Sequence, residues 1–174
     1  MTSGEYLDRI LERMIRTHNI TRGFTADGKL FAAYALYESS SEKYVFTRKA
    51  NLWKVSESEH VLFMTLPEDG NPKALFIEAA HLISDYMEPV FSRGNEKYPP
   101  KDHMRTFLTV VLLLEHSPNQ EFVSSVRRFR FDRSYLFSLR GFSQGRIIAV
   151  DLPNRSVYTS PAAKDVAGFY RQVL

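Results

Sequence analysis

The stretch MRTFLTVVLLL, Met104–Leu114, is the longest apolar run of the chain, and Glu115 follows it. Prolines at 99–100 and the turn residues at 117–119 bound it on both sides. Side chains of an extended strand alternate between two faces, and here both faces are apolar. Such a strand has to be covered on both sides. The run therefore predicts an interior strand of a sheet. It is too short to span a membrane, which takes about 20 apolar residues.

The flanking segments predict helices and further strands around this one. Thr2 and Glu5 have capping-box spacing before an amphipathic helix, and Asn71-Pro72 opens a second helix. Alternation and turn residues predict strands over 31–38, 43–55 and 60–66, then, after the central strand, over 122–131, 135–139 and 146–152, with a short piece around 157–158. Ser160-Pro161 starts a last helix. We expect one α+β domain, 1–174, with a mainly antiparallel sheet in α-βββ-α-ββββ-α order and helices covering one side.

Two segments share a pattern. Residues 31–55 and 107–133 each begin with an apolar strand that ends in glutamate, and each continues through a serine-containing loop to an aromatic–valine pair. The pattern leaves open an internal duplication with halves 1–70 and 71–174. Ordinary hairpin composition is the alternative explanation.

Composition limits the classes of function. The 174 residues are 44% hydrophobic and 25% charged, as in ordinary globular domains. Cysteine is absent, which excludes disulfides, thiolate nucleophiles and thiolate metal sites. The N-terminal residues lack a signal-type hydrophobic block. We expect a cytoplasmic protein with no cofactor and no bound metal.

The charge of the chain is unevenly distributed. The formal net charge is +3, yet residues 121–174 hold nine Lys or Arg against four Asp or Glu. Guanidinium groups bind planar anions and phosphates, so six arginines are candidate contacts for an anion or a nucleic acid: Arg127, Arg128, Arg130, Arg133, Arg140 and Arg146. As a strand, residues 126–133 would put Arg128, Arg130 and Asp132 on one face and Phe129 and Phe131 on the other. Stacking on nucleic acid needs both kinds of side chain on one face, so a half-buried strand with a solvated basic side is the alternative.

His103, beside Asp102 at the start of the central strand, is the best single candidate for proton transfer, because histidine titrates near neutral pH. The alternative is a histidine that bonds the backbone of a loop. Glu38 and Glu115 would be equivalent under the duplication and would pair for a cation or for acid–base chemistry, or else each solvates a strand end. The five histidines show no zinc-ligand spacing.

Two stretches carry a resemblance: HMRTFLTVVLLLE at His103–Glu115 and LRGFSQGRIIAVDLPNRSVYTSPAAKDV at Leu139–Val166. They resemble an uncharacterised family of small bacterial proteins, found mainly in Firmicutes, in which a His-Met pair starts a strand and a Gly-aromatic turn precedes a VDL strand. That family has a Gly-containing final turn where this chain has Ser160-Pro161. The resemblance implies a bacterial α+β protein and transfers no catalytic residue.

No motif identifies a reaction. A Gly-x-Ser-x-Gly elbow, a phosphate-binding glycine loop and the Asp with Glu-x-Lys of a metal-dependent nuclease are all missing from the sequence. We therefore interpret the chain as a non-catalytic interaction or binding domain. The alternatives are a nucleic-acid-binding protein that uses residues 126–133, and a hydrolase with a site near His103.

The aromatic content bears on association. With thirteen Phe, nine Tyr and one Trp, a sheet covered on one side only would expose an apolar patch larger than monomers carry. A twofold dimer that buries the same patch from both subunits is the common solution. We expect a homodimer that makes no membrane contact, with any other protein partner unknown.

Overall fold

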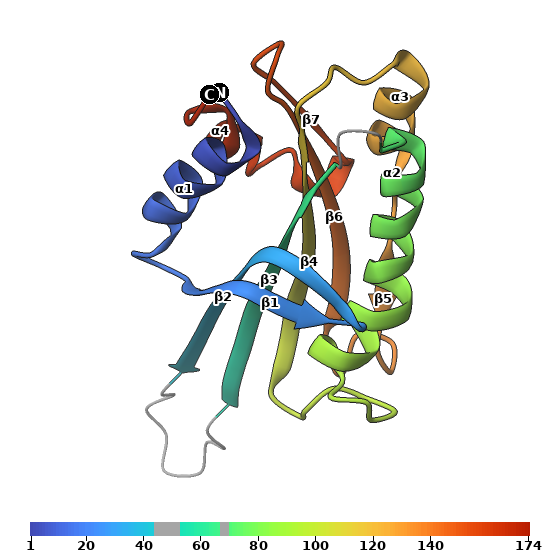
Figure 1. The fold of residues 1–174 in the computed structure, drawn as a ribbon. Coiled ribbons are helices and arrows are strands. Elements are labelled where there is room, and N and C mark those ends of the chain that lie inside the picture. The colour runs from blue at the N-terminus through green and yellow to red at the C-terminus, as the bar shows by residue number, and fades with distance from the viewer. Residues whose placement is uncertain (44–52, 67–69) are drawn as a thin grey trace.

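The strands of the protein form one mixed sheet with the central strand in its interior. The computed structural model describes residues 1–43, 53–66 and 70–174 (Figure 1). Its strands are β1 (Asn19–Ala26), β2 (Lys29–Lys43), β3 (Trp53–Thr65), β4 (His103–Leu114), β5 (Asp132–Ser134), β6 (Phe142–Asp151) and β7 (Ser156–Thr159). These described strands pair in the order β1-β2-β3-β4-β6-β5, and β7 also pairs with β6.

Both strand directions occur in the sheet. Among the described strands, β1 with β2, β2 with β3, and β6 with both β5 and β7 are antiparallel. The three inner strands β3, β4 and β6 run parallel and therefore need crossover connections. The first crossover contains α2 (Pro72–His81) and its π-helical continuation η1 (Leu82–Ser92), and the second contains α3 (Gln120–Arg128). The α+β class with a mainly antiparallel sheet is confirmed.

Helices cover both faces of the sheet, which gives three layers (Figure 1). α1 (Ser3–Met14) and α4 (Ala167–Arg171) pack on one face, and α2, η1 and α3 pack on the other. β4 contributes to both cores: Val110 faces the α2 side, Val111 faces the α1 side, and both are fully buried. The interior strand is thus confirmed, whereas the expected one-sided cover is wrong, because α1 and the C-terminal segment pack together on the second face. The hydroxyl of Tyr6 donates to the carbonyl of Tyr170 at 2.8 Å there.

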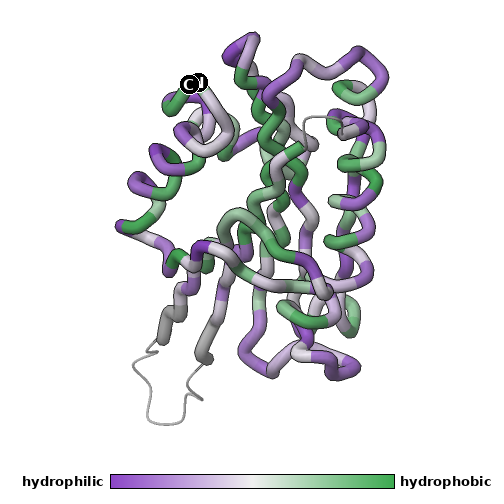
Figure 2. The backbone as a smooth tube through the Cα atoms, viewed as in Figure 1, coloured by the Kyte–Doolittle hydropathy of each residue, from purple (hydrophilic) through white to green (hydrophobic). Residues whose placement is uncertain are grey.

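Hydropathy changes along the inner strands. Figure 2 shows hydrophobic residues gathered where the helices cover the strands, and more hydrophilic residues toward the opposite end. On the α1 side of β3, fully buried Val61 and Phe63 are preceded by half-buried Glu57 and Glu59. The same sheet face is therefore a core at one end and a polar surface at the other.

The strand expected over 122–131 is wrong, because residues 120–128 form α3. The side chain of Asn119 caps this helix by accepting from the N–H of Phe122 at 2.9 Å. Phe122 and Val126, four residues apart, are both buried against the core. So short an apolar pattern fits both the helical and the extended repeat, and the Asn119 cap favours the helix.

The strand expected over 135–139 is also wrong. Leu136, Phe137 and Ser138 have φ angles of 49°, 53° and 69°, which places three successive residues in the left-handed region. The turn ends at Gly141, where a Cβ atom would lie 2.1 Å from the carbonyl oxygen of Met104. Only glycine fits that close approach.

The two segments with a shared pattern adopt different structures where they are described. β2 is followed by its antiparallel neighbour β3, whereas β4 is followed by α3. Residues 44–52 of the first segment lie outside the described residues. So do residues 67–69, which belong to the stretch Pro-Glu-Asp-Gly at 67–70 that predicts a turn. The duplication stays a prediction without support from these elements.

Replacing Val110 by Asp tests the interior position of β4. We expect the variant to lose its soluble folded state, because an unpaired buried carboxylate costs several kcal/mol. Met104→Asp is the matched control, since Met104 begins the same strand with 46% of its surface exposed. Circular dichroism and urea unfolding provide the measurement. A Val110→Asp protein that folds cooperatively would contradict burial on both faces.

Candidate functional site

Strand alternation places a set of polar and charged side chains together on the α1 side of the sheet. We call this set the polar half-face: Glu57 and Glu59 of β3, Arg105, Phe107 and Thr109 of β4, and Gln144 and Arg146 of β6. Glu59 is in register with Phe107, and Phe107 with Gln144, so these side chains lie side by side across three parallel strands. They begin where the cover by α1 ends.

Arg146 is the most buried charge of the polar half-face, with 5% of its side chain exposed. Its Nη1 donates to Oε1 of Glu59 and its Nη2 donates to Oδ2 of Asp165, each at 3.2 Å. The guanidinium carbon lies 3.5 Å from the ring centroid of Phe107, a close cation–π contact. Its Nε is buried without a hydrogen-bond partner among the described residues. The side chain is therefore held on three sides and retains one unused donor.

Arg105 repeats this arrangement one strand away. Its Nη2 donates to Oε2 of Glu57 at 2.8 Å, and its guanidinium carbon lies 4.8 Å from the same Phe107 centroid. Its Nε is likewise buried and finds no partner in the described part of the chain. About a third of each side chain of this ion pair is exposed, so the pair contributes little to stability.

Glu59 connects the polar half-face to the α1 layer. Its Oε1 accepts from the hydroxyl of Thr109 at 2.7 Å as well as from Arg146. Burial lowers the pKa of His18, and the negative charge of Glu59 opposes that shift. Burial raises the pKa of Tyr170 well above its usual value, and Glu59 adds to that effect. Glu59 thus lies close to His18 and Tyr170, and only 17% of its side chain is exposed.

A solvent-open hollow of about 640 Å³ adjoins the polar half-face. Two aromatic residues, Phe107 and Phe131, are among its lining, and Phe131 also packs against the core on the α2 side. The charged residues among its described lining are Arg105, Arg130, Arg146 and Lys164 on the basic side, with Asp132 and Asp165 on the acidic side. Basic groups exceed acidic ones by two, and aromatic rings lie among them. Sequence alternation separates Arg130 from Phe131, but the chain leaves α3 here and brings both to one surface.

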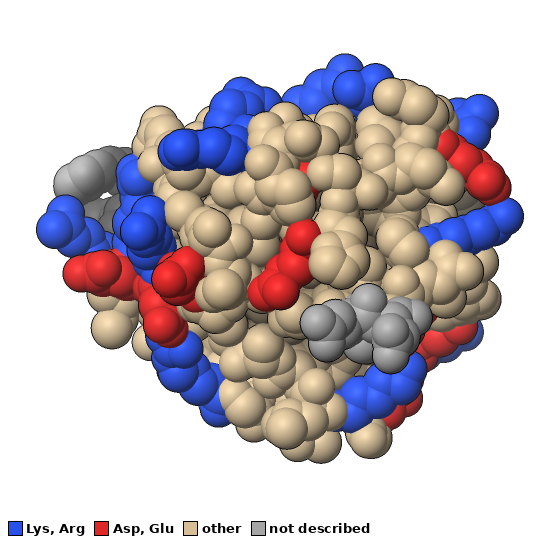
Figure 3. All heavy atoms as spheres, turned by 45° about the horizontal axis from the view of Figure 1, so that its top comes forward, with Lys and Arg blue, Asp and Glu red and all other residues tan. Residues whose placement is uncertain are grey.

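The six arginines named from the sequence do not form one patch. Arg130 and Arg146 line the hollow. The guanidinium carbon of Arg127 instead lies 5.8 Å from the ring centroid of Tyr158. Arg140 donates to the carbonyl of Pro99 at 2.8 Å, and Arg128 is exposed on α3. On the face drawn in Figure 3, basic groups are spread along the rim between acidic and uncharged ones.

Both ring nitrogens of His103 are bonded. Its Nδ1–H donates to the carbonyl of Arg140 at 2.7 Å, and its Nε2 accepts from the hydroxyl of Thr106 at 2.9 Å. Burial lowers its pKa, which favours this neutral form. The loop-bonding alternative thus describes His103. Glu115 lies at the other end of β4, where it accepts from the N–H of Ser3 at 2.7 Å and so has a lowered pKa.

Glu38 is exposed on β2, in register with Ser58. Ser58 in turn pairs with Thr106, so Glu38 lies on the same sheet face as the hydroxyl that His103 contacts. Glu115 is a strand length away from both. The structure therefore does not bring His103, Glu38 and Glu115 into one site.

A buried carboxylate that the sequence analysis missed lies on the α2 side. Glu88 of η1 is fully buried and accepts from Arg93 at 2.7 and 3.1 Å, from Arg133 at 3.2 Å and from the hydroxyl of Tyr135 at 2.7 Å. Burial is the main cause that raises the pKa of Tyr135 to about 12. Both carboxylate oxygens of Glu88 accept hydrogen bonds from these donors, and such pairing is what makes a buried charge tolerable. This closed network joins η1 to the segment after α3.

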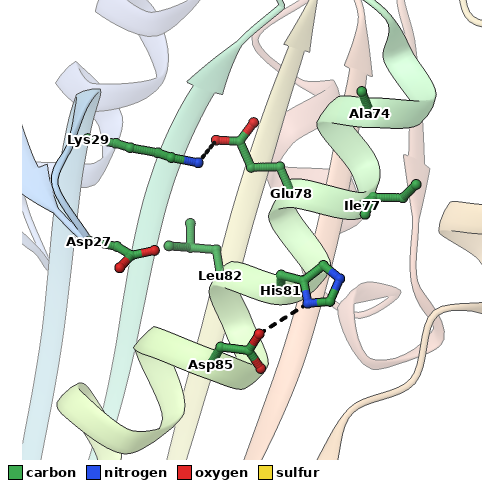
Figure 4. A pocket seen from close by; sticks show the side chains of 8 residues that line it. All are labelled: Asp27, Lys29, Ala74, Ile77, Glu78, His81, Leu82 and Asp85. Atoms are coloured by element: carbon green, nitrogen blue, oxygen red, sulfur yellow. Dashed lines mark hydrogen bonds and ion pairs between the residues drawn. The ribbon is translucent and has the colours of Figure 1, made fainter.

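A second hollow, of about 440 Å³, lies between the β1–β2 turn and α2 (Figure 4). Lys29 reaches across it to Glu78 at 2.6 Å, and His81 pairs with Asp85 at 3.1 Å on the helix itself. These ion pairs are largely exposed and worth little individually. Among the described residues no group of three or more His, Asp or Glu has the arrangement of a metal site. We interpret this hollow as the contact that ties the hairpin to α2.

The fold and the site define an α+β protein whose sheet carries a charged hollow with aromatic walls. Residues 2–172 match the model of the family described as Domain of unknown function (DUF8052), and the chain belongs to that family. No curated protein and no solved structure gives a significant match. None of the described helices has the length and apolar character needed to cross a membrane.

Burial of His60 makes the stability of the protein depend on pH. Its Nδ1 accepts from the hydroxyl of Tyr34 at 2.7 Å, and its ring stacks on Phe91 with centroids 4.6 Å apart. Burial lowers its pKa from 6.5 to about 4. Unfolding therefore lets this histidine bind a proton at mildly acidic pH, so the stability it supports is lost as pH falls below about 6.5.

We expect His60→Gln to flatten the pH dependence of unfolding. Between pH 7 and pH 5 the wild type should lose about 2 kcal/mol more of its free energy of unfolding than the variant. His116→Gln, at an exposed position after β4, is the control and should retain the wild-type slope. Urea titrations at both pH values measure this. Equal slopes for His60→Gln and wild type would contradict a buried neutral His60.

Proposed function

We propose that the protein is a non-catalytic binding domain that holds a nucleotide unit, a phosphate with an aromatic base, in the hollow beside the polar half-face. The observation that supports this most strongly is Arg146, a nearly buried guanidinium that lies on an aromatic ring and lines the hollow, and whose Nε is buried without a hydrogen-bond partner among the described residues. Arginine is suited to bidentate phosphate binding. A phosphate oxygen would complete the hydrogen bonding of this side chain.

The charge of the hollow favours a ligand with more than one negative charge. Four basic side chains and two acidic ones line the hollow, and one of those acids, Asp132, is engaged by the Nε2 of Gln144 at 2.6 Å. Glu57 and Glu59 pair with Arg105 and Arg146, so Arg130 and Lys164 are the basic lining groups to which the described residues supply no ion pair. A phosphate monoester carries up to two negative charges near neutral pH. This balance supports a phosphate over a single carboxylate.

The walls of the hollow favour a ligand with a flat ring. Phe107 and Phe131 line the same space as the basic side chains. Bases stack on such rings with little regard to sequence. The volume of about 640 Å³ is within the range of about 300–1,000 Å³ common for small-molecule sites.

The nucleotide unit has two sources, a free mononucleotide or one unit of a single-stranded nucleic acid. The second source is the nucleic-acid alternative in a changed form. Residues 126–133 are not a strand, but Arg130 and Phe131 from that segment reach the hollow together with Phe107. An open, charged surface with rings accommodates a continuing strand.

The hydrolase alternative loses support from the geometry. Both nitrogens of His103 are occupied, and Glu115 lies at the far end of β4. A general base needs a free nitrogen within reach of its substrate. We therefore favour binding over catalysis.

A bacterial origin, a cytoplasmic location and a homodimer stay predictions from the sequence. The missing cysteines and the family resemblance support the first two. The argument for a dimer from an uncovered apolar sheet face is weakened, because helices cover both faces of the sheet. Light scattering across a dilution series tests it: a mass near the 20.1 kDa of one chain would contradict a dimer.

Fluorescence anisotropy with a labelled oligothymidylate, and competition by thymidine monophosphate, test the proposed function. We expect Arg105→Met to weaken oligonucleotide binding about tenfold, since charge-assisted hydrogen bonds contribute about 1.5–3 kcal/mol. About a third of the Arg105 side chain is exposed and its ion pair contributes little to stability, so the change should leave the fold intact. Arg171→Met removes an exposed arginine from α4 and serves as the control.

Competition by the mononucleotide would identify a free nucleotide as sufficient. Binding of the oligonucleotide alone would identify the single strand as the source. A wild-type protein that binds neither probe would contradict the proposed function, and so would equal losses in Arg105→Met and Arg171→Met.

A further inference from the structure

We infer that Asp165 occupies the phosphate position on Arg146 in the free protein and leaves it when the ligand binds. The inference rests on the proposed function and adds a competing group from the chain itself. Its basis is the unequal setting of the two carboxylates that Arg146 contacts.

Glu59 is the fixed partner of Arg146. It belongs to the inner strand β3, only 17% of its side chain is exposed, and the hydroxyl of Thr109 holds the same Oε1 at 2.7 Å. Moving it away would leave a carboxylate in a poorly solvated place without its donors, which is unfavourable. Glu59 therefore stays with Arg146 in both states.

Asp165 is the exchangeable partner. It lies between the short helix η2 (Pro161–Ala163) and α4, outside the sheet, and 67% of its side chain is exposed. Its carboxylate can return to water at little expense, because it is already largely solvated. Its contact with Nη2 is 3.2 Å, the same length as the contact of Glu59 with Nη1, so exposure and not bond length distinguishes the two carboxylates.

The edge of the guanidinium that Asp165 contacts is only half used. Nε and Nη2 point their N–H groups in the same direction and form the edge that binds two oxygens of one anion. Asp165 takes Nη2, while Nε is buried without a partner. A buried donor left unpaired is unfavourable. The Nε has almost no accessible surface while Asp165 is in place, so a phosphate reaches both donors only after Asp165 leaves. It then replaces one long bond with two and removes that penalty.

Departure of Asp165 also changes the charge that the ligand meets. Asp165 is one of the two acidic residues that line the hollow, and the other, Asp132, is bonded to Gln144. Without Asp165 the basic side chains of the hollow act on the ligand with less opposition. The same carboxylate thus protects Arg146 in the free protein and weakens binding of competing anions.

The test compares Asp165→Asn with Asp132→Asn in the oligothymidylate anisotropy assay at fixed ionic strength. Each variant removes one negative charge from the lining of the hollow, but only the first frees Arg146. We expect Asp165→Asn to tighten binding about two- to fivefold, as the loss of an exposed ion pair allows. Asp132→Asn should tighten binding less.

Arg146→Lys makes the test specific for the guanidinium edge. Lysine keeps the charge but cannot present two fixed donors. Adding Asp165→Asn to Arg146→Lys should then give a smaller gain than it gives in the wild type, and the double-mutant cycle measures this coupling. Urea unfolding of each variant confirms that the compared proteins are folded.

The outcomes separate the inference from the proposed function. Tighter binding by Asp165→Asn than by Asp132→Asn, lost in the Arg146→Lys background, supports the inference. Equal effects of the two substitutions, or no effect of Asp165→Asn on a protein that binds the probe, overturn the inference and leave the proposed function in place. Failure of every folded variant to bind the probe overturns both.

Discussion

Burial of β4 on both faces is the constraint on which the rest of the structure depends. Fully buried Val110 and Val111 point to opposite sides of the sheet, so each side needs its own helical layer. The crossovers that bring β3, β4 and β6 into parallel register supply one layer, and the two ends of the chain supply the other. α1 and α4 cover only part of their face. The uncovered remainder of the inner strands carries the polar half-face.

The surroundings of Arg146 on the polar half-face allow its guanidinium to be almost fully buried. A guanidinium taken out of water is tolerated when carboxylates and a ring surround it, and Glu59, Asp165 and Phe107 do so here. Glu88 on the opposite side of the sheet has four donor contacts and is closed off. The Nε of Arg146, which lines a hollow, has no hydrogen-bond partner among the described residues. We therefore regard Arg146 as a candidate for ligand binding and Glu88 as part of a structural network.

Local patterns predicted much of the fold. The capping box of Thr2 and Glu5 is present, as is the interior strand, because each depends on neighbouring residues alone. α3 was missed because nine residues fit both a helical and an extended period, and the Asn119 cap was not weighed. The left-handed turn at 136–138 contains no glycine, so no sequence signal indicated it.

The site was harder to predict because its contacts are distant in sequence. Arg146 was among the candidate arginines, but Glu59 lies 87 residues away and meets it only through the register of three strands. The alternation on β3 that puts Glu57 and Glu59 on one face was a usable signal. Arg105 was missed because the apolar character of β4 dominated its interpretation. His103 bonds the carbonyl of Arg140 in a loop, which is the contact that the loop-bonding alternative expected.

The most direct measurement of the central claim is an NMR titration of arginine side chains with thymidine monophosphate, followed at the Nε–Hε resonances. Binding in the hollow predicts saturable shifts of the Arg146 and Arg105 signals, whose Nε groups have no hydrogen-bond partner among the described residues. The exposed Arg171 on α4 should not shift. Unchanged Arg146 and Arg105 signals at saturating ligand, or shifts confined to exposed arginines elsewhere, would contradict the account.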